Sequence, residues 1–468
     1  MPLAAGEGGW QGHEGLLPLE RFHRQMEPLK AAMASRARSL RGVGDEELTA
    51  RLERAQSLME AHRLDSILLT TEPDFFYFTG LHSKFWNSPT RPFFLLVPRE
   101  GRRPVAVIPS IMASCIVSRT WLHAEHVHTW PAPRPEDDGV SLLAQTIGAL
   151  PRKFGRVGFM MGAETTVRMP LRDIDQVRRL LSEQGVATED GWPLLRELRL
   201  VKSEWEVARV RHACAIASAA FALLPAKLRA LLATKASALS EREARDAFRA
   251  LALDLGADAA AYVMAQSGRG GYDNIVMEPT DRPLTAGDIL VIDTGIQFEC
   301  YWCDFDRNYV VGGPSHLPDD AARLHDKLWL ATEAGFEACS CGAKASAVFS
   351  AMARVLGVGQ QAADSPVGRF GHGLGLQLTE LFSNSPTDHT ELPAGCVMTL
   401  EPSMGISPDG ELMLAHEENV LITAEGPQWL SLRAPRTMQS ILEAEPGDSM
   451  HTDTLPALIT ELIHTLNL

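Results

Sequence analysis

The sequence lacks the features of membrane, secreted and nucleic-acid-binding proteins. No unbroken apolar run approaches the length needed to span a membrane. The opening residues, MPLAAGEGGWQGHEG, contain no basic segment followed by an apolar one, so we expect no signal peptide. The formal charge of −15, from 44 basic and 59 acidic side chains, argues against a nucleic-acid-binding surface. We therefore expect a cytoplasmic protein that works without a membrane or a nucleic acid.

Cysteine is also scarce, and its distribution argues against a disulfide framework. The chain has seven cysteines, an odd number spread thinly over 468 residues, which indicates reduced thiols. Two pairs, Cys300 with Cys303 and Cys339 with Cys341, have spacings that could bind a metal. No second CxxC or CxxH motif supports either pair, so we interpret these residues as buried thiols.

The chain is long and apolar enough to form two or three domains with full cores. It has 468 residues, of which 45% are hydrophobic. We predict a partly helical amino-terminal extension at residues 1–50, a first domain at 51–197, a second domain at 198–437 and a carboxy-terminal tail at 438–468.

The first part of the chain alternates predicted helices and strands. A helical pattern covers residues 19–60, where Leu, Met and Ala recur at spacings of three and four. Apolar runs predict strands at 65–71, 92–98, 104–109 and 157–160, and helical patterns lie at 141–150 and 171–184. This alternation predicts an α/β domain.

The second domain opens with a helix whose start is well marked. Ser203 is a favourable N-cap, and Glu206 three positions later completes a capping box. Helices continue to about Leu255, and a strand follows at 259–266. We predict further helices at 320–337, 345–356 and 455–466, the last as a docking helix of the tail.

Residues 289–311 contain two aspartates in an otherwise apolar setting. An apolar strand ends in Asp293, Gly295 permits a turn, and a second strand contains Asp304, eleven positions after the first aspartate. Burying an unpaired charge is costly, and two carboxylates on neighbouring strands could offset that cost by binding cations. From this stretch alone, the paired aspartates could also belong to a surface turn, and this alternative is the more common one for such a pair.

Three later residues favour a metal site. His372 lies among glycines that let the backbone approach a site closely, Glu401 ends an apolar strand, and Glu417 opens another. With Asp293 and Asp304 they make four carboxylates and one imidazole, which balance two divalent cations. Such a set suits Mn, Fe, Co or Zn. Two such ions would generate and hold a hydroxide nucleophile.

These five residues and their contexts resemble the metallopeptidase family of methionine aminopeptidase, aminopeptidase P and prolidase, to which creatinase also belongs. The resemblance implies an α/β (α+β) chain, with a creatinase-type amino-terminal domain followed by a pita-bread catalytic domain with a pseudo-twofold mixed sheet. It implies that Asp293 holds one metal, that His372 and Glu401 hold the other, and that Asp304 and Glu417 bridge them. Glu401 would also exchange protons with the bridging water.

The sequence departs from the peptidases of this family at three positions. Their first active-site histidine falls near Val276, their second at Thr379, and their arginine at Ala415. We expect a rebuilt site in which Tyr272 is catalytic, donating to an oxyanion or acting as a base if its pKa is lowered. Substrate-binding candidates near it are Gln377, Thr379 and His416, with Glu380 as a further member of the rebuilt site. Each could instead be structural.

The amino-terminal domain offers two further features. A loop at residues 85–92 contains Trp86 and Arg91, which we predict to bind substrate as part of a lid; the alternative is a turn with Trp86 in the core. The segment at 75–81 resembles a family segment that reaches towards the partner subunit's active site. The resemblance therefore implies a homodimer.

Three functions fit these observations. The first is a dinuclear metallohydrolase of the Xaa-Pro aminopeptidase or prolidase type, which cleaves a C–N bond of a short peptide through a metal-bridging hydroxide. The second is a lyase or small-molecule hydrolase on the same scaffold, like a dimethylsulfoniopropionate lyase or ectoine hydrolase, because both peptidase histidines are missing. The third is a non-catalytic metal-bound binding module. Intact ligands disfavour the third, since unused buried charges would destabilise the fold.

Overall fold

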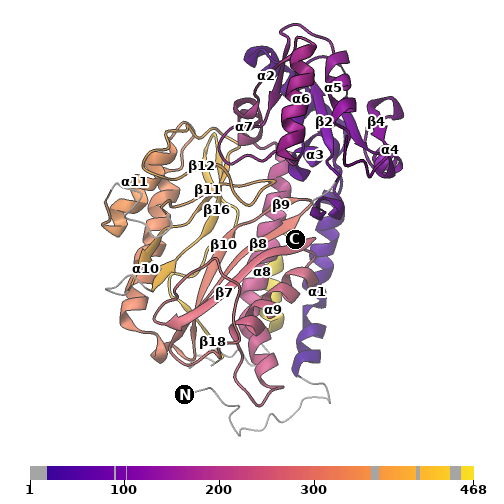
Figure 1. Cartoon of the computed structure of the whole chain (residues 1–468). Coiled ribbons are helices and arrows are strands. Elements are labelled where there is room, and N and C mark those ends of the chain that lie inside the picture. Colours follow the sequence, from indigo (N-terminus) through magenta and orange to yellow (C-terminus); the bar gives the residue numbers. More distant parts are fainter. Residues whose placement is uncertain (1–17, 89–90, 102, 360–367, 407–411, 443–454) are drawn as a thin grey trace. The chain divides into compact units, whose positions relative to one another are not determined.

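The computed structural model describes residues 18–88, 91–101, 103–359, 368–406, 412–442 and 455–468. The chain divides into two compact units (Figure 1). One comprises Gly42–Val201, and the other combines the residues up to Arg41 with those from Lys202 onward. The first helix therefore belongs to the same unit as the carboxy-terminal half of the chain.

The unit Gly42–Val201 is an α/β domain built on a mixed six-stranded sheet with strand order β4-β3-β2-β1-β5-β6. The strands are β1 (Ser66–Leu69), β2 (Phe94–Pro98), β3 (Val105–Pro109), β4 (Val127–Trp130), β5 (Arg156–Phe159) and β6 (Ala187–Asp190). The helices are α2 (Asp45–His62), α3 (Glu72–Thr79), α4 (Ala113–Arg119), α5 (Val140–Ala149), α6 (Leu171–Glu183) and α7 (Trp192–Leu200). The strands predicted from apolar runs are present, whereas β4 and β6, which are short and partly exposed, were not predicted.

The predicted helix at 19–60 is two helices, and they lie in different units. α1 spans Pro18–Leu40, and α2 begins at Asp45. Gly42 between them has a φ of +80°, a left-handed conformation that a continuous α-helix does not contain. The helical spacing of apolar residues persists across the break, and this is why the pattern alone did not reveal it.

The second unit repeats an order of elements, a helix pair followed by antiparallel strands. The first half has α8 (Glu204–Leu232), α9 (Glu241–Asp254), β7 (Ala259–Arg269), β8 (Asp288–Phe298), β9 (Tyr301–Trp302) and β10 (Phe305–Val311). The second has α10 (Asp319–Ala338), α11 (Ala345–Leu356), β11 (His372–Gly373), β12 (Glu380–Ser383), β13 (Val397–Leu400), β16 (Glu418–Thr423) and β17 (Gly426–Trp429). This repetition agrees with the predicted pseudo-twofold pita-bread architecture.

The strands of this unit form two five-stranded sheets and one small hairpin (Figure 1). One sheet has the order β18-β10-β8-β7, with β18 at Gln439–Ile441 and with β9 paired to β8. The other has the order β12-β11-β13-β16-β17. The hairpin consists of β14 (Ser403–Gly405) and β15 (Met413–Ala415).

Helix α8 is the apolar centre of this unit. Its capping box is formed as predicted, because the Ser203 side chain accepts from the backbone N–H of Glu206 and the Glu206 carboxylate accepts from the backbone N–H of Ser203. Among the described helices, α8 alone is long and apolar enough to cross a membrane by length and composition. The sequence alone shows no unbroken apolar run of that length. In the structure, 67% of the most apolar part of α8 is buried, as in the core helix of a folded domain.

The hairpin with the two aspartates turns later than we predicted. β8 runs through Gly295 to Phe298, and the turn falls at Glu299 and Cys300, whose φ angles are +49° and +66°. Gly295 is needed for close packing, since a Cβ there would collide with the Leu378 side chain. Asp304 lies between β9 and β10 rather than within a strand.

The carboxy-terminal helix α12 (Leu455–Thr465) docks on α1. The Arg36 guanidinium of α1 donates a hydrogen bond of 2.9 Å to the carbonyl of Leu466. The predicted docking helix therefore packs against the amino-terminal helix of the same unit.

Candidate metal centre

The five predicted ligands all lie in the second unit, one within a strand and the other four at or next to strand ends. Asp293 lies within β8, Asp304 follows β9, and His372 opens β11. Glu401 follows β13, and Glu417 directly precedes β16. Their roles as ligands stay a prediction, and the turn between the first two falls later than the sequence indicated.

The structure brings these residues into two groups that share one member. Possible ligand atoms of Asp293, Asp304 and Glu417 lie within 4.8 Å of one another, and so do those of Asp304, His372 and Glu401. Asp304 belongs to both groups, as expected of a bridging ligand. Glu417 falls in the first group, beside Asp293.

The orientation of the His372 ring is fixed by the backbone around it. Its Nδ1 lies 2.9 Å from the carbonyl oxygen of Gly373, so Nδ1 carries the proton and Nε2 faces the carboxylates. Nε2 lies 2.9 Å from Oε1 of Glu401 and 3.3 Å from Oδ2 of Asp304. The backbone N–H of His372 donates to the Thr399 hydroxyl at 2.9 Å, which anchors β11 to β13.

Burial and mutual repulsion raise the pKa of three carboxyl groups in the centre. The pKa of Asp293 is far above its ordinary value because the group is buried and faces Asp304 and Asp306. Burial, followed by the charges of Asp293 and Glu401, raises the pKa of Glu417 in the same direction. Burial also raises the pKa of Asp304 to about 6, against the opposing effect of His372.

The pKa values of His372 and Glu401 shift in opposite directions, as those of an ion pair do. Burial alone would lower the pKa of His372, but the charges of Glu401 and Asp304 outweigh burial and raise it to about 10. Burial alone would raise the pKa of Glu401, but its contact with His372 outweighs burial and lowers it. The centre therefore favours added positive charge.

The donor set fits divalent cations. Oδ1 of Asp293 is buried and has no hydrogen-bond partner among the described residues. Buried carboxylate oxygens without donors are costly, and metal coordination is a common way to satisfy them. Carboxylates with one imidazole match the preferences of Mn, Fe, Co and Zn.

A shell of polar residues holds the ligands in place. The Asn419 side chain accepts from the backbone N–H of Asp304 at 3.0 Å and donates to the carbonyl of the same residue. The Asp306 carboxylate accepts from the backbone N–H of Glu417 at 2.8 Å, and Arg307 donates to the Glu417 carbonyl at 3.1 Å. Such partners fix the orientation of metal ligands.

Glu418, beside Glu417, faces a different environment. Its carboxylate is fully buried and lies 3.0 Å from Arg307 and 3.2 Å from Arg433. It also accepts from the Ser431 hydroxyl and from the backbone N–H of Ala434. Glu418 is thus a structural carboxylate that the chain neutralises itself.

Tyr272, our predicted catalytic residue, has a structural setting. Its ring is fully buried, and its oxygen accepts from the backbone N–H of Ala415 at 2.6 Å. Burial and the charge of Asp306 raise its pKa well above the ordinary value, whereas a role as base requires a lowered pKa. The structure therefore argues against Tyr272 as a base.

His416 is likewise engaged away from the carboxylates. Its Nδ1 lies 3.2 Å from the Thr332 hydroxyl on α10, and its Nε2 lies 3.3 Å from Arg433. Burial, with the charge of Arg433, holds its pKa well below the ordinary value. A side chain that is only 2% exposed and bonded at both nitrogens does not suit the predicted substrate-binding role.

The three predicted site residues that follow His372 have different surroundings. Glu380 forms a buried ion pair of 2.9 Å with Lys202 and accepts from the backbone N–H of Leu376, so it holds the local turn. Gln377 is exposed. Thr379 is half-buried, and its hydroxyl lies 3.5 Å from the Arg369 guanidinium. Gln377 and Thr379 remain predicted substrate contacts.

Sequence reasoning missed three residues beside the centre. Tyr262 on β7 lies opposite Gly295 of β8. Because Gly295 is two positions from Asp293, Tyr262 and Asp293 lie on the same face of the sheet. Asp306 pairs directly with Asp293. Arg369 is close enough for its charge to lower the pKa of Asp304 and Glu401. The Asp-Phe-Asp alternation at 304–306 indicated Asp306, whereas Tyr262 and Arg369 required the strand register and the loop path.

Trp86 and Arg91 belong to the unit Gly42–Val201. Trp86 is 9% exposed and packs edge-on against Phe75 and Phe93, with ring centroids 5.2 and 4.7 Å away. This contact set matches the alternative of Trp86 as a core residue. Arg91 has a φ of +60°, and its guanidinium lies 5.8 Å from the Phe85 ring. Its role in substrate recognition stays a prediction.

Two family models match the chain. Residues 208–424 match the metallopeptidase family M24, and residues 51–201 match the creatinase/prolidase N-terminal domain. An Xaa-Pro dipeptidase from Pyrococcus horikoshii is 23% identical over 378 residues, which are 80% of this chain and 94% of that protein. The comparisons give no support to the lyase alternative.

Solved structures share the fold. Prolidase from Thermococcus sibiricus superposes with a TM-score of 0.69 at 21% identity, over 86% of this chain and all of that one. The N-terminal domain of the FACT complex subunit SPT16 from chickpea (Cicer arietinum) gives a TM-score of 0.67 at 13% identity, over 86% and 100%. Because a protein described as a complex subunit has the same fold, the fold alone does not identify a metallopeptidase. The family assignment therefore rests on the family-model matches. The chain belongs to the pita-bread metallopeptidase family, in its creatinase–prolidase branch.

Proposed function

We propose that this protein is a dinuclear metal-dependent hydrolase of the Xaa-Pro dipeptidase type, which cleaves a C–N bond in a short peptide or similar small substrate. The observation that carries the proposal is the pair of ligand groups joined at Asp304. Asp293 and Glu417 would hold one ion, and His372 and Glu401 the other. Manganese, iron, cobalt and zinc fit this donor set.

When bound, two such ions would lower the pKa of water to near neutrality and polarise a substrate carbonyl. Glu401 suits proton transfer beside them. Its Oε1 lies 2.9 Å from Nε2 of His372, and its lowered pKa keeps it ionised near neutral pH. This oxygen could accept a proton from the attacking water and return it to the leaving nitrogen.

Tyr262 takes the place that we first gave to Tyr272. Its hydroxyl donates to the carbonyl of Ile275 at 3.1 Å. Burial and the charge of Asp293 raise its pKa, so the phenol stays protonated. A protonated phenol beside the centre could donate a hydrogen bond to the developing oxyanion.

Arg369 provides a positive charge for the substrate. The guanidinium lies 3.3 Å from the Ser383 hydroxyl and 3.5 Å from that of Thr379. No ion pair joins it to a carboxylate among the described residues. A half-buried arginine that is hydrogen-bonded to two hydroxyls, and whose charge also acts on Asp304 and Glu401, could hold the carboxylate of a dipeptide.

A comparison of two tyrosines tests the assignment of Tyr262. Tyr262→Phe should lower kcat for a metal-loaded enzyme by roughly 10²–10³-fold, the usual effect of one oxyanion donor. Tyr272→Phe, the control, should lower stability more than kcat, because it removes the acceptor for the Ala415 N–H. Equal kcat values for Tyr262→Phe and the unmodified protein would contradict this role of Tyr262.

The missing histidines favour a non-peptide substrate as the second candidate. Val276, near which the first family histidine falls, is 68% exposed, and the second position is Thr379. General acid–base groups contribute roughly 10²–10⁴-fold, so Xaa-Pro dipeptides should be cleaved at least about a hundredfold more slowly than by the family peptidases. A panel of Xaa-Pro dipeptides, N-methyl amidines and sulfonium zwitterions separates the candidates. Robust Xaa-Pro cleavage would eliminate the second, and Val276→His with Thr379→His should raise dipeptide cleavage if the scaffold accepts peptides.

We also propose a homodimer, by analogy with the family segment that residues 75–81 resemble. Light scattering at micromolar concentration should give about twice the chain mass of 51.2 kDa. A monomer under those conditions would contradict this proposal without affecting the metal centre.

A further inference from the structure

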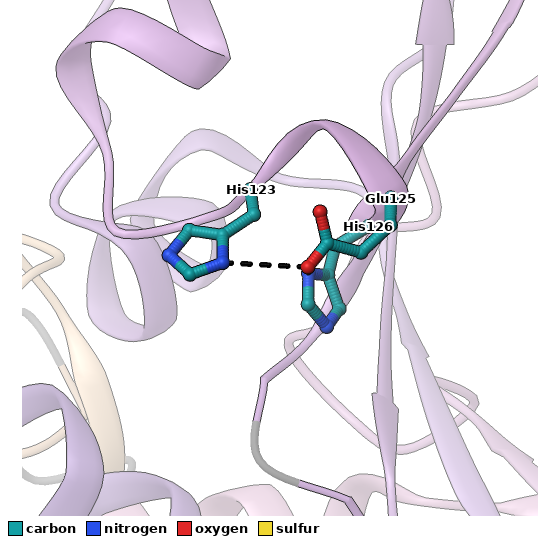
Figure 2. Close-up of side chains that lie close together, drawn as sticks. All are labelled: His123, Glu125 and His126. Carbon is teal, nitrogen blue, oxygen red and sulfur yellow. Dashed lines mark ion pairs between the residues drawn. The ribbon is translucent and has the colours of Figure 1, made fainter.

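The unit Gly42–Val201 contains a second group of metal-binding side chains, formed by His123, Glu125 and His126. All three lie within four consecutive residues, at the 3₁₀ turn η3 (Ala124–His126) that leads into β4. Figure 2 shows the Glu125 carboxylate between the two imidazole rings. The tight turn brings the three side chains to one place.

The two rings point the same nitrogen at one oxygen. Nδ1 of His123 lies 3.4 Å from Oε1 of Glu125, and Nδ1 of His126 lies 3.9 Å from that same oxygen (Figure 2). One ligand atom from each residue lies within 4.8 Å of the other two. Ligands about 2.0–2.2 Å from a tetrahedral zinc ion are roughly 3.3–3.6 Å apart, so small side-chain rotations would complete such a site.

His126 Nδ1 is an independent sign of a ligand. This atom is buried and has no hydrogen-bond partner among the described residues. Burial lowers the pKa of His126, so its ring is neutral near pH 7, the form that binds metals. A buried polar atom without a partner calls for an explanation, and a bound ion is one of those that proteins use.

We propose that His123, Glu125 and His126 form a surface site for one divalent transition-metal ion of the zinc class. Two imidazoles and one carboxylate are a ligand set that zinc accepts, and imidazole suits copper and nickel as well. The side chains of His123 and Glu125 are 60% and 68% exposed, so the fourth position is open to water or to a ligand from solution. The site shares no residue with the metal centre of the other unit and does not rest on the proposed catalytic function.

Zinc titration of the full-length protein tests the proposal. Calorimetry should show one more zinc ion bound per chain for the unmodified protein than for the double variant His123→Ala/His126→Ala. The number of ions bound at the metal centre of the other unit should be the same in both proteins. The matched control is His62→Ala: the His62 ring also lies 3.4 Å from a carboxylate, that of Glu197, but no second imidazole joins that pair in the described metal-ligand groups. The His62→Ala protein should bind as many zinc ions per chain as the unmodified protein.

Two further measurements fix the location. Glu125→Gln should weaken the same equivalent without disturbing the fold, because the carboxylate is exposed. Anomalous scattering at the zinc edge from crystals of the full-length protein should place an ion between the two Nδ1 atoms. An unchanged zinc count in the double variant, or an equal loss in His62→Ala, would overturn the proposal.

Discussion

Glu417 and Glu418 follow each other in the chain, yet their carboxylates lie in opposite surroundings. Both side chains are buried, with exposures of 4% and 0%. Glu418 lies within 3.2 Å of Arg307 and Arg433. Glu417 faces Asp293, Asp304 and Glu401 instead, and no lysine, arginine or histidine among the described residues forms an ion pair with it.

The difference shows what kind of positive charge each region uses. A buried carboxylate requires a partner, and around Glu418 the chain supplies two guanidinium groups. Around Glu417 it supplies further carboxylates, and we propose that bound cations provide the compensating charge. Glu417, directly before β16, and Glu418, which opens it, thus have different surroundings: Glu418 is neutralised within the chain, and Glu417 is a proposed metal ligand.

The largest expected effect comes from removing the metal-facing carboxylate. Glu417→Ala should lower the metal content below that of the unmodified protein and abolish turnover, because it removes a ligand from the Asp293 group. The fold should persist, since the change relieves repulsion among buried carboxylates. Elemental analysis with circular dichroism checks both points. A variant that retains full metal content would show that the strand register is off by one residue.

Removing the neighbouring carboxylate should act on stability instead. Glu418→Ala should lower the free energy of unfolding by about 3–5 kcal/mol, because it leaves Arg307 buried without its carboxylate partner and removes one of the two carboxylates that pair with Arg433. Denaturant titration measures the change. Glu425→Ala, at an exposed position after the same strand, is the control and should change stability by less than about 0.5 kcal/mol. Loss of metal from a folded Glu418→Ala protein would contradict the proposed difference in role between Glu417 and Glu418.

A residue that acts through Glu417 should have an intermediate effect on metal affinity. Asp306→Ala removes the acceptor for the Glu417 backbone N–H and should weaken metal binding by about 10–100-fold. Asp306→Asn keeps an acceptor oxygen and should retain most of the affinity. Metal titration of both variants distinguishes positioning from general damage, because general damage would not be rescued by asparagine.

The smallest expected effect is a dependence of metal stabilisation on pH. Raised pKa values mean that Asp293, Glu417 and His372 keep protons in the folded protein that the unfolded chain releases. Without metal, these three groups should therefore make stability fall as pH rises from 6 to 8.5, against an opposite contribution below about pH 7 from His212, His325 and His416, whose pKa values burial lowers. The lowered pKa of Glu401 adds no trend there, since that group is ionised in both states. Bound metal replaces those protons, so the rise in Tm on adding metal should be larger at pH 8.5 than at pH 6. An equal rise at both values would contradict the assignment.

The sequence predicted the ligand set better than its surroundings, and the reason is physical. Asp293, Glu401 and Glu417 are charged residues next to apolar strands, and such residues stand out because burial of charge is rare. The capping box at Ser203 was predicted because it is local. Tyr262, by contrast, faces the centre through its pairing with Gly295, and this register cannot be read from period-two alternation alone.

The errors have similar causes. Gly295 suggested a turn, but its missing side chain makes room for Leu378, a residue 83 positions later in the chain. Tyr272 and His416 were attractive because tyrosine and histidine carry chemistry, yet both are occupied by the backbone and by α10. Whether a polar side chain faces a site or the core depends on long-range packing, which one sequence does not display.

Metal content of the purified protein tests the central claim most directly. If the Asp293, Asp304 and Glu417 group and the Asp304, His372 and Glu401 group each hold an ion, elemental analysis after reconstitution with manganese or iron should give two ions per chain. Zinc is left out of this measurement, and the His123→Ala/His126→Ala variant is used where iron is added, so that the His123 site does not contribute. A content well below one per chain, with no gain on reconstitution, would contradict the account.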